Sequence, residues 1–288
     1  MPDQTFKRIQ VNPISGALGA EIEDVDLGDL DDAVFAEIHD AWLAHQVVFF
    51  RDQDITPDQQ IAFARRFGDI HHHPFMKGMN AYPDILEIVK EEGDTHTFGS
   101  VWHTDQMFNP QPAKATMLYA KEAPAAGGDT LFASMYLGYE ALSDGMKAML
   151  GDVRTWSVGD KFKRSGGLKR RDHYAGNSQM AGMVKDPGNV PTEAAHPLFR
   201  THPETGRKGL YIGDHAQTLE GFKDDEAEPI LDFLRAHAVR PEFTCRFRWQ
   251  PGSLALWDNR CVQHHAVADY PGQRRRMHRI TIAGDTPY

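Results

Sequence analysis

The strongest constraint on the fold is a series of short β-forming runs that no regular pattern of helices separates. The clearest run is residues 243–249, in which apolar and polar side chains alternate strictly, as in a strand with one buried face. Pro251 and Gly252 then turn the chain into another run at residues 254–257. Similar runs occupy residues 47–50, 85–89, 116–120, 130–133 and 210–212. Without a βαβ rhythm, these runs favour a sandwich or barrel of the jelly-roll type over a parallel sheet.

Three segments carry helix patterns instead. Thr56 and Gln59 supply an N-cap and a capping-box partner on either side of Pro57, and this combination predicts the start of a helix. Amphipathic spacing predicts two further helices, through residues 34–42 and near residues 230–234. The sequence therefore predicts a mainly β protein with flanking helices, which is an α+β class.

Composition and length exclude several classes of protein. The chain has 31 Lys plus Arg against 41 Asp plus Glu, a net charge of −10, which argues against nucleic acid as a partner. Its longest strongly apolar run, residues 47–50, is far shorter than the roughly 20 residues of a membrane helix, so no membrane association is expected. No repeat or linker divides the 288 residues, and we expect one domain over residues 1–288.

Cysteine usage and the N-terminus bear on the compartment. Cys245 and Cys261 are the two cysteines of the chain, too few for a disulfide framework. Residues 1–4 lack the basic and apolar regions of a signal peptide. We therefore expect reduced thiols and a cytoplasmic protein.

Histidine is unusually frequent, with 15 residues, and it is the commonest metal ligand. His103 and Asp105 stand two positions apart. On a strand, such residues point to the same face, so both could reach one ion. This spacing is not specific by itself, because a surface pair that bonds locally has the same pattern.

The C-terminal segment 257–279 strengthens the metal hypothesis. A histidine from this segment would complete two histidines and one carboxylate, the facial triad of non-haem Fe(II) oxygenases. If the segment is a strand, Arg275 and Arg279 share one face. Their planar guanidinium groups could then hold two small anions near the metal. The alternative is an exposed basic strand on an acidic protein.

A basic, glycine-containing region at residues 160–191 shows little periodicity. It is either a solvated surface loop or a mobile lid whose cations attract an anionic substrate. Phe162 within this region is either a wall of the substrate pocket or filler of a loop or core.

Several motifs, taken in order, resemble the TauD/TfdA family of Fe(II)/2-oxoglutarate-dependent dioxygenases, which act on taurine-type and aryloxyalkanoate-type acids. The resemblance implies a double-stranded β-helix, a cupin-like jelly roll, and it spans nearly the whole chain. The segments that carry it are residues 19–22, 25–27, 67–68, 103–105, 127–130, 257–260 and 264–279.

The resemblance implies a role for each matching residue. His103, Asp105 and His264 would ligate Fe(II) and form the catalytic centre, with His264 rather than its neighbour in the ligand position. Arg275 matches the arginine that binds the distal carboxylate of the cosubstrate 2-oxoglutarate, and Thr130 matches the threonine that assists it.

Other matches concern the substrate, which we expect to be a small anionic organic molecule. Arg279 matches the arginine that receives the acidic group, and His73 matches a histidine of the same pocket, although residues 71–73 alone suggest an exposed polar turn. Gly99 replaces an asparagine of the taurine enzymes, and a large aromatic residue is replaced near His215 or Ala216. These departures predict an enlarged pocket with less polar discrimination, which fits an aryloxyalkanoate, an alkyl sulfate or another bulkier organic acid, such as a larger sulfonate, better than taurine.

The implied reaction consumes O2, decarboxylates 2-oxoglutarate to succinate and CO2, and hydroxylates the organic acid. If the hydroxylated carbon bears an ether, sulfate or sulfonate, the product collapses to a carbonyl and releases a leaving group.

Three alternatives stay open: a taurine dioxygenase proper, a zinc-dependent cupin-type hydrolase or isomerase, and a non-catalytic metal-dependent binding protein. A zinc-dependent hydrolase or isomerase would have no need for Arg275 or Thr130 near the metal. The resemblance also implies a homo-oligomer, a dimer or tetramer.

Overall fold

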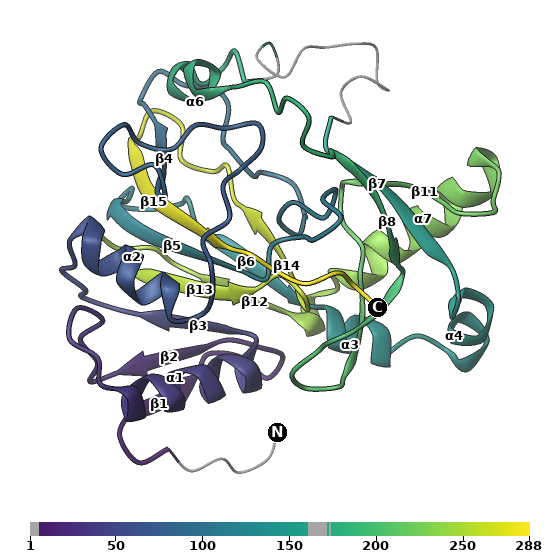
Figure 1. Ribbon diagram of the computed structural model, residues 1–288, viewed down its shortest axis with the longest axis horizontal. Helices are drawn as coiled ribbons and strands as arrows, with labels where there is room; N and C mark the ends of the chain where they lie inside the picture. Colours follow the sequence, from purple (N-terminus) through teal and green to yellow (C-terminus); the bar gives the residue numbers. More distant parts are fainter. Residues whose placement is uncertain (1–5, 161–171, 173) are drawn as a thin grey trace.

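The computed structural model describes residues 6–160, 172 and 174–288, and β-sheets form the framework of these residues (Figure 1). The larger sheet has seven strands in the order β1-β2-β3-β13-β5-β15-β4. Its strands are β1 (Gln10–Pro13), β2 (Ala20–Glu23), β3 (Val47–Phe50), β4 (Leu86–Lys90), β5 (Ala115–Glu122), β13 (Leu254–Asp258) and β15 (Arg275–Ile282). Its neighbouring strands are antiparallel, apart from the parallel pair β2 and β3.

A three-stranded sheet in the order β12-β6-β14 faces the larger one. Its strands are β6 (Thr130–Ser134), β12 (Thr244–Phe247) and β14 (Val262–Ala266). Side chains of both sheets share one buried cluster, which contains Phe49, Phe132, Phe247 and Trp257. The rings of Phe49 and Phe247 stack across the sheets with centroids 4.0 Å apart. Two facing sheets with a common core are the architecture of a jelly roll, so the predicted mainly β fold class is confirmed.

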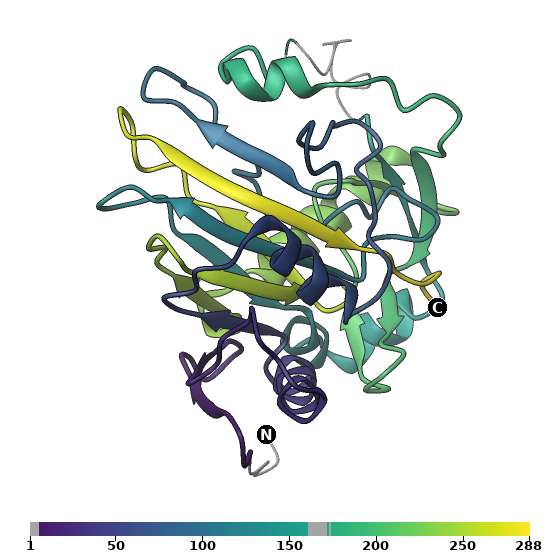
Figure 2. The same ribbon diagram turned by 60° about the vertical axis from the view of Figure 1, so that its left-hand side comes forward.

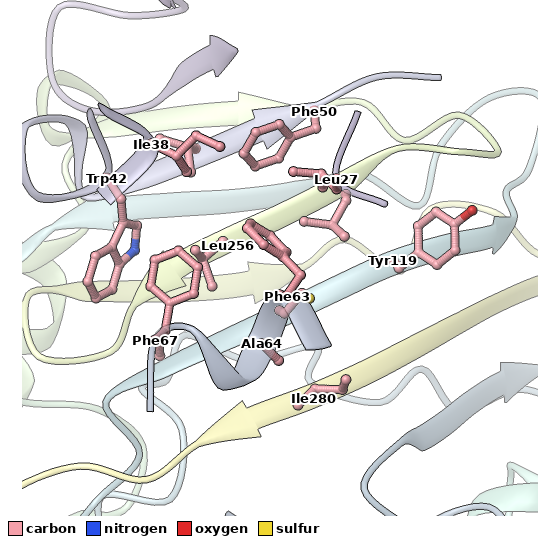
Figure 3. Close-up of a cluster of buried hydrophobic side chains, with 14 of the residues drawn as sticks. Leu27, Ile38, Trp42, Phe50, Phe63, Ala64, Phe67, Tyr119, Leu256 and Ile280 are labelled. Carbon is pink, nitrogen blue, oxygen red and sulfur yellow. The ribbon is translucent and has the colours of Figure 1, made fainter. Parts of the chain in front are cut away.

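Two helices cover the opposite face of the larger sheet, α1 (Asp32–His45) and α2 (Pro57–Arg65). Successive side chains of a strand point to opposite faces, so Leu256 contacts these helices whereas the next residue faces the smaller sheet. Figure 3 shows this cluster, with Trp42 and Phe63 from the helices beside Leu256 and Ile280 from the sheet. One sheet thus separates two apolar cores, and the site lies on the side that faces the smaller sheet.

The remaining elements pack at one end and one edge of the two sheets. Strands β7 (Arg154–Val158), β8 (Glu193–Pro197) and β11 (Ala216–Leu219) form a further sheet, and β9 (Phe199–Thr201) pairs with β10 (Lys208–Leu210). The accompanying helices are α3 (Met135–Glu140), α4 (Asp144–Leu150), α7 (Asp224–Ala238) and the 3-10 helix η2 (Pro241–Phe243). Helix α6 (Ser178–Met183) packs beyond β4, at the sheet edge (Figure 2). Among the described residues, no helix is both long and apolar enough to cross a bilayer.

Most of the predicted elements are present, and the differences have local causes. The capping box of Thr56 and Gln59 opens α2 as predicted. The strand predicted at 243–249 is shorter, because Pro241–Phe243 form a 3-10 turn and pairing with β6 covers only Thr244–Phe247. The strand predicted at 210–212 begins two residues earlier, at Lys208, and ends at Leu210, where its pairing with β9 ends.

The predicted lid falls partly on residues 161–171 and 173, which lie outside the described residues together with Phe162. In the described remainder, Asn177 caps α6 and donates a hydrogen bond from its side chain to the Val89 carbonyl at 2.9 Å. This contact fastens the start of α6 to β4. Movement of the segment stays a prediction.

Candidate active site

The predicted metal ligands converge at the open end of the two facing sheets. His264 lies on β14, and His103 pairs with it through an isolated bridge between their backbones. Nε2 of His103 lies 3.8 Å from Oδ1 of Asp105, and Nε2 of His264 lies 3.9 Å from Oδ2. One ligand atom from each residue falls within 4.8 Å of the others. The three side chains therefore form a cluster of the size that one metal ion needs.

The strand-based argument for this convergence was wrong in one respect. Residues 103–105 form no strand, because His103 makes only a single bridge and a turn begins at Asp105. Gln106 within that turn adopts a positive φ of 54°, which is unusual for a residue other than glycine. A turn, not strand parity, brings Asp105 to the same ion site as His103.

Burial sets the charge of the ligands. It lowers the pKa of His103 to about 4 and that of His264 well below its usual value, so both imidazoles are neutral near pH 7. Burial opposes ionisation of Asp105, but the charge of Arg279 and the hydrogen bond from Thr116 hold its pKa below the usual range. Two neutral imidazoles and a carboxylate are the protonation states that metal binding requires.

Buried polar groups hold the Asp105 carboxylate in place. Thr116, on β5, donates a hydrogen bond to Asp105 Oδ2 at 2.6 Å. The Asn259 amide donates to the Thr116 hydroxyl at 2.9 Å, and its oxygen accepts from the Asp105 backbone N–H at 3.3 Å. Both supporting residues are at most 1% exposed. Partners of this kind orient metal ligands, and spacing in the sequence did not point to them.

A small cavity of about 40 Å³ lies between the sheets beside the metal cluster. Thr130 and Arg275 line it together with His103, Asp105 and His264. Arg275 is buried, and its Nε and Nη2 atoms have no hydrogen-bond partner among the described residues. A buried cation with unused donors favours binding of a carboxylate. The residues present therefore fit a 2-oxoglutarate carboxylate at this end of the cavity.

A second cavity of about 160 Å³ also adjoins the metal cluster and shares His103, Asp105 and Arg279 with the first. Aromatic and imidazole rings make much of its wall: His73, His96, Phe98, Phe108, Tyr174 and His215. Phe108 and His215 meet edge to face with centroids 4.9 Å apart. Arg279, on β15, lines both cavities and lies 2.8 Å from Asp105 Oδ1, an ion pair without hydrogen-bond alignment.

The predicted pocket residues are brought together apart from two. His73 and Gly99 line the larger cavity, whereas Ala216 is fully buried in β11 and lines neither cavity. Phe162 lies outside the described residues. Gly99 has a φ of +77°, and a Cβ there would lie 3.3 Å from His103 Cε1, so its missing side chain leaves room directly against a metal ligand.

The wall of the larger cavity also carries polar groups, and the expected loss of polar discrimination stays a prediction. Gln106 lines the larger cavity, and its amide oxygen accepts hydrogen bonds from His71 and Asn109 at 2.7 and 3.1 Å. Its amide nitrogen has no partner in the described part of the chain. Asp214 also lines the cavity. Neither residue belongs to a recognisable motif, and Gln106 could be suspected only from its place after Asp105.

A second group of potential ligands, His202, Asp258 and Cys261, is a structural network. His202 shares one hydrogen with Asp258 at 2.9 Å, and its Nδ1 accepts from two backbone N–H groups. Arg260 donates to both oxygens of Asp258 at 2.8 and 2.6 Å. These bonds already occupy both ring nitrogens of His202 and both carboxylate oxygens of Asp258.

The jelly-roll sheets and the cluster of two histidines and one carboxylate have the arrangement of mononuclear metal enzymes in which three protein ligands leave coordination positions free, as in non-haem oxygenases. The sequence matches the family described as "Taurine catabolism dioxygenase TauD, TfdA family" over residues 10–281. The chain belongs to this family. Membership confirms the predicted enzyme class, a dioxygenase that depends on iron and 2-oxoglutarate.

Individual relatives cover almost the whole chain. The (S)-phenoxypropionate/alpha-ketoglutarate-dioxygenase of Sphingobium herbicidovorans is 36% identical, over 96% of this chain and 95% of that protein. The alpha-ketoglutarate-dependent sulfate ester dioxygenase of Pseudomonas putida is 33% identical, over 97% and 91%. The crystal structure of a taurine dioxygenase from Burkholderia xenovorans superposes with a TM-score of 0.81 at 33% identity, over 98% and 93%.

Proposed function

We propose that the enzyme hydroxylates a small organic acid with an apolar body, an aryloxyalkanoate or an alkyl sulfate, while 2-oxoglutarate is converted to succinate and CO2. The observation that carries the proposal is the pair of cavities that meet at the metal cluster. One contains the buried Arg275 guanidinium, whose Nε and Nη2 atoms have no hydrogen-bond partner among the described residues, and the other has ring-lined walls. A cosubstrate and an acid could thus reach the metal from two sides.

The residues of this chain have separate tasks in that reaction. His103, Asp105 and His264 would hold Fe(II), and Arg275 with Thr130 would hold 2-oxoglutarate. When bound, Fe(II) and 2-oxoglutarate with O2 supply the oxidation. The protein contributes position and exclusion of water.

Arg279 determines the orientation of the substrate. Its guanidinium is buried at the junction of the two cavities, where it would bind the acidic group of the substrate. The body of the substrate would then lie against the Phe98, Phe108 and Tyr174 rings. This arrangement presents the carbon between acid and body to the metal. If that carbon carries an ether or sulfate oxygen, hydroxylation would release a phenol or sulfate.

Aromatic walls support an aryloxyalkanoate over taurine. Rings contact a flat apolar body over a large area, and a relative 36% identical is named for phenoxypropionate. Taurine would present a charged ammonium to this wall, and Gly99 offers no side-chain donor or acceptor beside His103. A sulfate ester remains the second candidate, since a relative 33% identical is named for that class.

A panel of acids tests this proposal. Purified enzyme with Fe(II), 2-oxoglutarate and O2 is offered phenoxypropionates of each chirality, phenoxyacetates, alkyl sulfates, alkyl sulfonates and taurine. Succinate that depends on the added acid is measured together with released phenol or sulfate. We expect coupled succinate and phenol from an aryloxyalkanoate. Succinate with taurine alone, or with none of these acids, would contradict the proposed substrate class.

Three broader expectations belong to the same proposal. A cytoplasmic location is supported by Cys245 and Cys261, both of which are free and buried. One domain over residues 1–288 is supported by sheets that combine strands from both ends of the described chain. A dimer or tetramer rests on the family resemblance alone.

A further inference from the structure

Trp249 occupies a buried position directly behind the small cavity. It follows β12 and is 2% exposed, although within the described residues it lines neither cavity. Its indole N–H donates a hydrogen bond to the Thr130 hydroxyl at 2.9 Å. The same indole ring lies 5.7 Å from the Arg275 guanidinium carbon. Trp249 therefore contacts both residues that would hold the cosubstrate carboxylate.

The hydrogen bond determines what the Thr130 hydroxyl can do. A hydroxyl has one hydrogen to donate and lone pairs that accept. Because Trp249 N–H is a donor only, Thr130 must act as the acceptor in this bond. Its own hydrogen has no acceptor among the described residues and remains available to an anion in the cavity. The tryptophan thereby directs the threonine to act as a donor.

The indole ring has a second effect, on Arg275. Burial lowers the pKa of this guanidinium, whose Nε and Nη2 atoms lack partners in the described part of the chain. A ring face within about 6 Å of a cation attracts it electrostatically. The Trp249 ring thus helps to hold the buried cation before an anion is bound.

We propose that Trp249 is a positioning residue for the distal carboxylate of the cosubstrate and acts through Thr130 and Arg275. The inference rests on the proposed roles of those two residues. It assigns Trp249 no contact with the cosubstrate itself. The hydrogen bond to Thr130 and the ring beside Arg275 make separate contributions, which different substitutions can separate.

The test compares 2-oxoglutarate binding in matched variants. Trp249→Phe keeps a ring but removes the N–H, Trp249→Leu removes both, and Thr130→Val removes the acceptor. The dissociation constant for 2-oxoglutarate is measured anaerobically from the visible charge-transfer band of the Fe(II) enzyme, with the Fe(II) affinity measured separately. We expect Trp249→Phe to raise the 2-oxoglutarate constant roughly fivefold, the equivalent of one hydrogen bond, and Trp249→Leu to raise it further. The Fe(II) affinity should not change.

A double-mutant cycle is decisive. If Trp249 acts through Thr130, Trp249→Phe adds little to Thr130→Val. The matched control is Trp156→Phe, which removes an indole hydrogen bond to Glu193 at 3.2 Å in a residue that lines neither cavity. The proposal is overturned if the Trp249→Phe constant equals that of the control, or if the two effects are fully additive.

Two further results keep the outcomes separate. Thr130→Ser retains the hydroxyl that accepts the Trp249 hydrogen bond, so we expect near-native 2-oxoglutarate affinity in this variant. This test remains available if the Trp249 variants fail to fold. A loss as large as that of Thr130→Val would overturn the inference. If the native enzyme shows no 2-oxoglutarate-dependent band, the proposed function fails. If the native enzyme shows the band and both Trp249 variants bind 2-oxoglutarate with native affinity, only the role of Trp249 fails.

Discussion

At the scale of single residues, the site depends on polar side chains whose partners are fixed before any ligand arrives. Asp105 is the clearest case, since Thr116 and Asn259 bond its carboxylate and its backbone N–H. One carboxylate oxygen is thereby occupied, and the other faces His103 and the Arg279 guanidinium. The metal would meet a carboxylate whose orientation these bonds already set.

Removal of the Thr116 hydroxyl should therefore weaken metal binding. Thr116→Val keeps the shape of the side chain but leaves Asp105 Oδ2 without its 2.6 Å hydrogen bond. Loss of such a partner typically costs about 10- to 100-fold in metal affinity, and we expect an Fe(II) affinity lowered by that amount. Anaerobic Fe(II) titration measures it. Thr116→Ser should restore most of the affinity, and equal losses in both variants would contradict the argument.

Arg275 should determine the affinity for 2-oxoglutarate. Hydrogen bonds to a charged group contribute about 1.5–3 kcal/mol, so Arg275→Ala is expected to raise the 2-oxoglutarate dissociation constant at least tenfold. The KM for the organic acid should change little. Arg276→Ala is the matched control, because this neighbour points to the other face and pairs with Glu87 at 2.7 Å.

Arg279→Ala is expected to raise the KM of the acid more than that of 2-oxoglutarate. Its ion pair with Asp105 at 2.8 Å adds an effect on the metal, so the Fe(II) affinity must be measured in the same variant. If Arg275→Ala and Arg279→Ala change both KM values equally, the two arginines do not divide the labour as proposed.

Gln106 should contribute to the choice of substrate. Its amide nitrogen lacks a partner among the described residues, while its oxygen is held by His71 and Asn109. Gln106→Leu removes that donor at similar size. We expect a lower kcat/KM for acids with an acceptor oxygen next to the reacting carbon. Acids that carry a methylene there should be affected less, and a uniform loss would exclude this role.

At the scale of helices and strands, the sequence predicts an element correctly where residues close together in the chain determine it. The capping box of Thr56 and Gln59 was read directly, because both partners lie within one turn. The inward face of β15 followed from alternation, with Arg275, Met277 and Arg279 all buried. The two-residue spacing of His103 and Asp105 indicated a shared ion only on an assumed strand, and the family resemblance supplied the more specific indication. The turn that begins at Asp105 has no period that a pattern could show.

The capping box offers a test of stability apart from the site. Thr56→Ala removes the side-chain bond to the Gln59 backbone N–H and should lower the free energy of unfolding by about 1 kcal/mol. Urea unfolding monitored by circular dichroism measures the change. The affinity for 2-oxoglutarate should stay at its native value; a changed affinity would show that α2 influences the site.

At the scale of the whole molecule, one carboxylate joins three distant parts of the chain. Glu204, in the turn between β9 and β10, accepts a hydrogen bond from Arg260 at 2.5 Å and lies 3.2 Å from His39 of α1. Its contact with His39, opposed by burial and aided by Arg260, lowers its pKa to about 2. No local pattern in the sequence predicts these contacts of Glu204, because Arg260 and His39 lie about 56 and 165 positions away along the chain.

The lowered pKa gives a pH dependence of stability. An acid with a depressed pKa stabilises the fold above its unfolded pKa, near 4.5, and this contribution is lost as pH falls through about 2. Glu204→Gln should therefore reduce the free energy of unfolding at pH 7 and have little effect near pH 2. Urea unfolding across this range checks the sign. A constant difference at every pH would mean that the charge of Glu204 is not the cause.

The central claim is that two cavities meet at one iron site, with 2-oxoglutarate in the cavity of Arg275 and an organic acid in the other. Anaerobic titration of the native enzyme with Fe(II), then 2-oxoglutarate, then a phenoxypropionate tests it most directly. We expect a weak visible charge-transfer band that appears with 2-oxoglutarate, is lost in Arg275→Ala at the same concentration, and shifts when the acid is added. Absence of the band, together with full activity on Zn²⁺ alone, would contradict the account.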